Sequence, residues 1–130
     1  MRTSGLLLGI VVLVWLPIEE SSALGMLVVA VLICTWAGIW LLLKTDSHRE
    51  HGIIRHMLIG GGAGFVVAPL AILLMAIKTG IHGHGVPDFT VEQMQAVLSR
   101  MPYFIFGGLL VGAGSGLLRA AKQDQIQELN

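Results

Sequence analysis

Residues 107–116 read GGLLVGAGSG and place Gly108, Gly112 and Gly116 four residues apart inside an apolar run. In an α-helix this spacing puts the three glycines on one face. Helices in lipid associate through faces of this kind, because there is little hydrophobic drive between them and close backbone approach supplies the packing. The stretch therefore predicts a membrane helix that packs closely against another helix.

A second stretch, GGGAGFVVA at residues 60–68, places Gly60, Gly64 and Ala68 at the same spacing. We expect the two small-residue faces to meet, either with each other or with copies in a neighbouring molecule. The run 60–64 is rich in glycine but is not followed by the Lys-Ser/Thr pair of a phosphate-binding loop. We therefore assign it to helix packing.

The composition places the whole chain in a membrane. Its 130 residues are 55% hydrophobic and 12% charged, whereas charged residues make up about 25% of a soluble domain. The formal net charge is zero, so no basic field attracts nucleic acid, and nucleic-acid binding is excluded from the expected functions. Cys34 is the single cysteine, which rules out an internal disulfide.

The predicted fold is one all-α integral membrane domain with four transmembrane helices. A helix needs about 20 residues to cross the hydrocarbon core, and the first apolar segment is shorter than that. This segment also fits a signal peptide, with Arg2 before an apolar run and small residues at 21–23. We expect it to be a true first helix. The expected helices cover residues 5–18, 23–43, 56–78 and 101–121, followed by a short tail at 122–130.

The distribution of basic residues predicts the orientation, since short cytoplasmic loops collect lysine and arginine. With the N-terminus inside, six basic residues face the cytoplasm and two face outward. The inner set is Arg2, Lys44, Arg49, Arg55, Arg119 and Lys122, and the outer set is Lys78 and Arg100. We expect both termini to be cytoplasmic, in a bacterial plasma membrane.

The outer loop before the last span contains a predicted short helix at residues 90–100. Thr90 and Gln93 have the spacing of a capping box, with Asp88 as a rival N-cap. The apolar residues Val91, Met94, Val97, Leu98 and Met101 share one face of this helix. That pattern predicts either a helix lying among lipid headgroups or a cover over the outer end of the helices.

The same loop carries a candidate metal site in KTGIHGHGVPDF, residues 78–89. His82 and His84 point the same way if the chain is extended. Asp88, with Glu19 or Glu20 from the facing turn, completes a set of two imidazoles and one carboxylate that suits a divalent ion such as zinc. The alternative is a flexible turn in which Gly80, Gly83 and Gly85 surround solvated histidines.

Two further side chains stand out near the span ends. His56, at the start of the third span, is the candidate axial ligand for a haem or pigment, against the alternative of a histidine beside anionic lipid heads. Trp36 lies about 12 Å from Lys44 by helical rise, where we expect it to fill a groove or a partner's surface. No cofactor is expected from the sequence.

The missing residue types decide between function classes. No acidic or basic side chain lies within the predicted spans away from their ends, which disfavours proton-coupled transport. Catalytic motifs are also absent. We expect a non-catalytic accessory or assembly subunit of a larger membrane complex, in contact with lipid and with other membrane proteins. The alternative is a self-associated channel or transporter for an ion or neutral solute, lined by glycine, Thr35 and Ser115.

Overall fold

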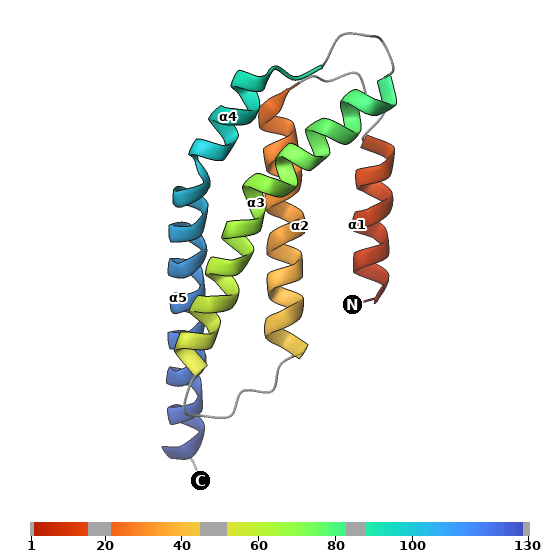
Figure 1. The fold of residues 1–130 in the computed structure, drawn as a ribbon. Helices are drawn as coiled ribbons and strands as arrows, with labels where there is room; N and C mark the ends of the chain where they lie inside the picture. Colours follow the sequence, from red (N-terminus) through yellow and green to blue (C-terminus); the bar gives the residue numbers. More distant parts are fainter. Residues whose placement is uncertain (1, 16–21, 45–51, 83–87, 129–130) are drawn as a thin grey trace.

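The computed structural model describes residues 2–15, 22–44, 52–82 and 88–128, and these residues are almost entirely helical. No strand occurs in these ranges. The elements, in chain order, are α1 (Arg2–Trp15), α2 (Ala23–Lys44), α3 (Gly52–His82), α4 (Val91–Ser99) and α5 (Met101–Glu128), as drawn in Figure 1.

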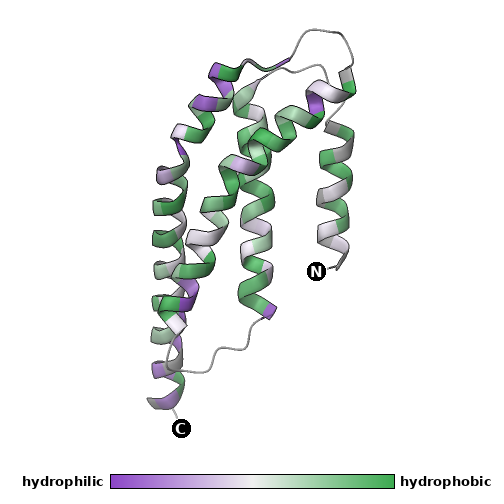
Figure 2. Ribbon diagram, in the orientation of Figure 1, coloured by the Kyte–Doolittle hydropathy of each residue, from purple (hydrophilic) through white to green (hydrophobic). Residues whose placement is uncertain are grey.

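Three helical stretches among the described residues are long and apolar enough to cross a membrane: Ala23–Lys44, Gly52–Ile81 and Val91–Gln127. Figure 2 shows that their middle parts are mostly hydrophobic and that hydrophilic residues gather at their ends. The chain is therefore an α-helical integral membrane protein. The 14 residues of α1 extend only about 21 Å, less than the ~30 Å of hydrocarbon, so a fourth span stays a prediction.

The long helices extend beyond the predicted spans. Whereas a third span over 56–78 was expected, α3 begins at Gly52 and ends at His82. The last helix continues to Glu128, through most of the stretch expected to be a tail. Pro69 lies inside α3 without ending it, and Figure 1 shows that α3 bends along its course, as a proline within a helix favours.

The described helices form an open row with α3 at its centre. The most extensive contact joins α3 to α5, and α2 packs against another side of α3. In contrast, the described backbones of α2 and α5 do not approach each other closely, and α1 approaches only α2. Figure 1 shows α1 standing at one edge of the row and α5 at the other. Among the described residues, nothing covers the two edges of the row or the space between α2 and α5.

The contact of α2 with α3 forms the apolar core. On α2 the buried residues are Met26, Ala30, Cys34 and Gly38, four residues apart along one face. Those of α3 include Val67, Ala68, Ala71, Leu74 and Met75. A Cβ atom at Gly38 would lie 3.5 Å from the Cβ of Ala63, which is ordinary contact. The small side chains on α2 therefore set how closely these two helices approach.

The short helix α4 covers one end of this core. The predicted capping box is present: Thr90 Oγ1 accepts from the Gln93 amide at 3.2 Å, and the Thr90 amide donates to Gln93 Oε1 at 2.9 Å. Val97 is buried and Met94 packs against the core. Val91 and Leu98, on the same apolar side of α4, are exposed within the chain. The expected position of this side among lipid headgroups stays a prediction.

Candidate functional site

The closest approach in the molecule lies where α3 crosses α5. A Cβ atom at Gly60 would overlap the carbonyl oxygen of Gly108, and a Cβ at Gly108 would overlap the carbonyl oxygen of Gly60. Two helical backbones reach this separation only when neither residue carries a side chain. Gly60 and Gly108 therefore lie at the centre of the crossing within a single chain.

The other predicted packing residues continue this contact in both directions. Toward the end covered by α4, a Cβ at Gly64 would overlap the carbonyl oxygen of Phe104. On the opposite side of the centre, a Cβ at Gly112 would overlap the carbonyl oxygen of His56, and one at Gly116 would lie 2.9 Å from the Cα of Ile53. Ala68 is fully buried in the core. The two helices run in opposite directions, and each glycine of one helix meets the backbone of the other about one turn further along. The contact therefore extends over about three helical turns.

A groove of about 360 Å³ opens between α2 and α5, over the face of α3 that lies between them. Its walls come from α2 between Val31 and Leu42 and from α5 between Tyr103 and Ser115, and its floor includes Ile59 and Ala63. Nearly all of the lining is apolar. The groove exists because α2 and α5 both pack against α3 while their backbones do not approach each other closely.

The groove contains two hydroxyl groups, on Thr35 and Ser115. Ser115 Oγ donates a hydrogen bond to the carbonyl oxygen of Gly112 at 2.8 Å, so its proton is used within the helix. Thr35 is exposed on the groove side of α2. Cys34 also lines the groove but is itself a buried, free thiol. The predicted pore-lining residues Thr35 and Ser115 thus face the same space from opposite walls.

Lys78 was missed by sequence reasoning as an interior residue. It was expected at the start of an outer loop, whereas its side chain is 1% exposed within α3. The helical spacing of the apolar residues could have indicated this burial. Lys78 follows the buried residues Ala71, Leu74 and Met75 by seven, four and three positions, which places it on the same face of the helix. Together with Phe89, which is 2% exposed, Lys78 is among the largest fully buried side chains.

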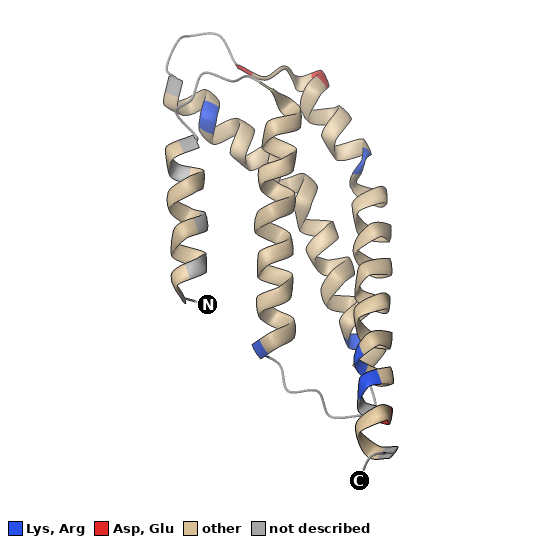
Figure 3. Ribbon diagram, turned by 180° about the vertical axis from the view of Figure 1, so that it is seen from behind, with Lys and Arg blue, Asp and Glu red and all other residues tan. Residues whose placement is uncertain are grey.

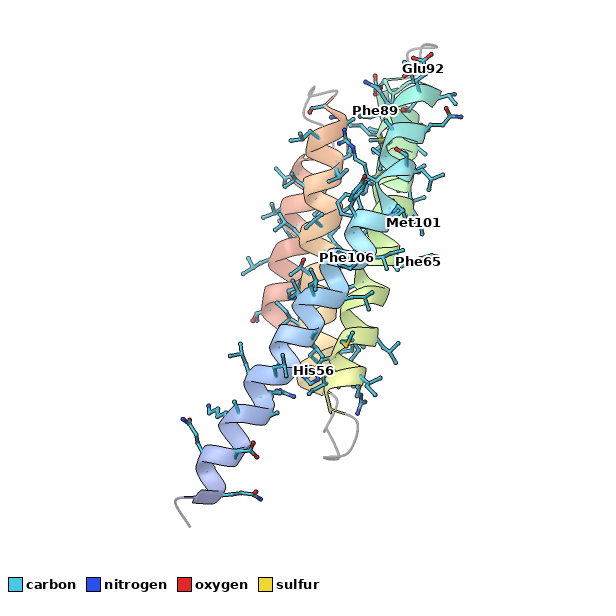
Figure 4. All side chains as sticks on the ribbon, turned by 90° about the vertical axis from the view of Figure 1, so that its left-hand side faces the viewer. His56, Phe65, Phe89, Glu92, Met101 and Phe106 are labelled. Carbon is cyan, nitrogen blue, oxygen red and sulfur yellow. The ribbon has the colours of Figure 1, made fainter. Side chains whose placement is uncertain are left out.

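Figure 4 shows Phe89 and Glu92 at the end of the molecule that α4 covers and His56 at the other end. His56 is buried, and its Nδ1 lies 2.5 Å from the carbonyl oxygen of Gly52. Since a carbonyl oxygen only accepts, this hydrogen bond places a proton on Nδ1. The ring does not line the groove, and a role for His56 in binding haem or pigment stays a prediction.

The residues of the predicted metal site fall mostly outside the described part of the chain. His84, Glu19 and Glu20 lie in the stretches 83–87 and 16–21, and the side chain of His82 is likewise not described. Asp88 lies beside the buried Phe89. Within the described residues, no three of the side chains of His, Cys, Asp and Glu come together in a group that could hold a metal ion.

Two tryptophans of α2 have clear local partners. A Cβ atom at Gly5 would lie 2.7 Å from a ring carbon of Trp36, so Trp36 packs where α1 has no side chain. The ammonium group of Lys44 lies 4.7 Å from the ring centre of Trp40, a cation–π distance typical of a membrane-interface pair. Trp36 thus fills a contact within the chain, one of the two roles expected for it.

Taken together, the described residues present a glycine-lined crossing of two helices and an apolar groove beside it. An apolar groove of this kind can bind apolar chains or helices. Comparison of the chain with protein-family models, with curated proteins and with solved structures finds no match.

Proposed function

We propose that this protein is a small, non-catalytic subunit or assembly factor of a larger membrane protein complex. The open row of helices is the observation that carries the proposal, since α2 and α5 are each held by α3 while the remaining faces lack a partner in the described chain. Such a row encloses no path of its own across the membrane. Its contribution is therefore to offer helix surfaces to other chains.

The lack of charged groups in the middle of the spans supports this assignment, and the buried Lys78 lies near one end of the span Gly52–Ile81. No Asp, Glu, Lys or Arg occurs at residues 24–43, 56–77 or 101–118, and transport or proton relay usually depends on such groups inside the membrane. Broad apolar surfaces remain exposed on both sides of the row. They include Leu32 and Ile39 on α2 and Phe106, Leu110 and Leu117 on α5.

The proposed location is the plasma membrane of a bacterium, with both termini in the cytoplasm. Figure 3 shows basic residues at the end of α2, at the start of α3 and near the C-terminus of α5. These are Lys44, Arg55, Arg119 and Lys122. The excess of positive charge at this end favours a cytoplasmic location for it.

Affinity isolation from the native membrane tests the function directly. The tagged protein is extracted in mild detergent, and every co-isolated protein is quantified by mass spectrometry against a tagged, unrelated membrane protein of similar abundance. The proposal expects at least one foreign membrane protein in a fixed stoichiometric ratio to the chain. Recovery of this chain with only substoichiometric contaminants would contradict it.

A second candidate function is a small channel formed by several copies. The hydroxyl groups of Thr35 and Ser115 favour it, because both line the groove and would face a shared pore if copies closed around it. Purified protein in sealed liposomes provides the test, with Thr35→Val and Ser115→Ala as variants. Solute flux that depends on either hydroxyl supports the channel, and flux equal to that of empty liposomes excludes it.

A further inference from the structure

The groove between α2 and α5 has the length and the apolar lining that suit a hydrocarbon chain. Its walls extend over about 17 Å, from Val31 to Leu42 and from Tyr103 to Ser115, at 1.5 Å of rise per residue. Its volume is about 360 Å³, and nearly all of its lining is apolar.

Glycines at positions such as Gly107 and Gly112 carry no side chain and so leave room for a chain between the two walls. In a bilayer an apolar groove of this kind is filled by the hydrocarbon that surrounds it.

The cytoplasmic end of the groove is positively charged. On α3 the lining residue Ile59 is followed one turn nearer that end by Arg55, and on α5 Ser115 is followed one turn later by Arg119. Lys44 ends α2 at the same end of the row, as seen in Figure 3. Guanidinium and ammonium groups at this depth bind phosphate oxygens of lipid headgroups.

The opposite end of the groove lacks this excess of positive charge. There the described residues include Arg100, Glu92 and Asp88, so the charges are mixed. An anionic headgroup is consequently favoured at one end only. The direction of the charge asymmetry along the groove fixes the orientation of a bound lipid, with its headgroup at the cytoplasmic side.

From these observations we infer that the groove is a binding site for one anionic phospholipid. One acyl chain lies between α2 and α5, and the phosphate group contacts Arg119 with Lys44 and Arg55 nearby. The site goes beyond the proposed subunit function and does not depend on it, because it needs only this chain and a bilayer. A bound lipid of this kind covers the floor of the groove on α3.

Native mass spectrometry of the full chain, released from nanodiscs of phosphatidylcholine with a minor fraction of phosphatidylglycerol, tests the site. The wild type is expected to retain one phosphatidylglycerol per chain in preference to phosphatidylcholine. Gly107→Leu is expected to lose it, because Gly107 lines the groove and has free space for a side chain. Gly114→Leu is the matched control, since Gly114 on the same helix also has free space but does not line the groove.

A charge variant tests the headgroup contact without altering the groove. Arg119→Gln is expected to lower the preference for phosphatidylglycerol over phosphatidylcholine about fivefold, the effect of one basic side chain near a lipid surface. Arg100→Gln, at the other end of the groove, is expected to leave the preference unchanged. Circular dichroism of each variant confirms that the helices are retained.

Three results would overturn the inference. Equal lipid retention by the Gly107 and Gly114 variants would show that the groove is not the site. No preference of the wild type for the anionic lipid would remove the headgroup contact. Third, Gly107→Leu could retain the lipid but no longer bind a second copy of the chain or a foreign helix. That result would show that the groove binds protein instead.

Discussion

Gly60 and Gly62 are two residues apart on α3 and have opposite surroundings. A Cβ at Gly60 would overlap the backbone of α5, whereas a Cβ at Gly62 would meet nothing within 4 Å. Gly60→Ala is expected to destabilise the protein by about 1–3 kcal/mol, because α5 must move away to make room. Gly62→Ala is expected to be neutral or slightly stabilising, since alanine is the better helix former.

Unfolding free energies measured for both variants in bicelles, against the wild type, check this prediction. The same comparison on α5 pairs Gly108→Ala with Gly114→Ala, because only the first would meet the backbone of α3. Equal stabilities within either pair would contradict a direct backbone contact at the crossing.

Lys78 differs from the other lysines in exposure. Its side chain is 1% exposed, while Lys44 and Lys122 are exposed at the other end of the helices. In detergent solution we expect an amine-reactive, water-soluble reagent to acylate Lys78 more than about tenfold more slowly than Lys44 or Lys122, since reaction at a buried amine requires local opening. Peptide mass spectrometry over a time course measures the three rates, and similar rates would place Lys78 at the surface.

At the scale of the element, α4 depends on its capping box. Thr90→Ala removes the hydrogen bond that Thr90 Oγ1 accepts from the Gln93 amide, a loss of about 1 kcal/mol of helix stability. We expect faster hydrogen exchange at the Gln93 and Met94 amides, measured by NMR in micelles. Ser99→Ala is the control, because Ser99 Oγ bonds only the Ala96 carbonyl at the exposed far end of α4. Unchanged exchange in Thr90→Ala would refute the cap's role.

The docking of α1 against α2 includes a close contact at Gly5. Gly5→Leu is expected to displace α1 from α2, because a side chain at this position would meet the ring of Trp36. Gly9→Leu is the control, since a Cβ at Gly9 meets nothing within 4 Å. With Trp15 and Trp40 replaced by phenylalanine, brominated lipid is expected to quench Trp36 fluorescence more strongly in the Gly5 variant alone. Identical quenching in both variants would argue against this contact.

At the scale of the whole molecule, local patterns could be read from the sequence and arrangements could not. The spacing of Gly108, Gly112 and Gly116 indicated a packing face, and Thr90 with Gln93 indicated a helix start, because both depend only on nearby residues. The sequence left open whether the glycine faces meet within one chain or between copies. In the structure they meet within one chain, through the antiparallel crossing of α3 and α5.

Two features escaped prediction for a physical reason. The charge of Lys78 suggested a loop, yet the apolar period of α3 continues through it and its stem is long enough to fill the core. The groove arises because the backbones of α2 and α5 do not approach each other closely. The separation of α2 from α5 depends on how three helices are arranged in space. The spacing of apolar residues within one helix does not indicate that arrangement.

The mass and composition of the intact particle released from the native membrane test the central claim most directly. The account predicts a particle in which each 13.9 kDa chain accompanies a fixed number of foreign membrane subunits, with an anionic lipid bound per chain. Native mass spectrometry resolves all three components in one spectrum. A particle containing only copies of this chain would contradict the proposed role as a subunit and favour the channel.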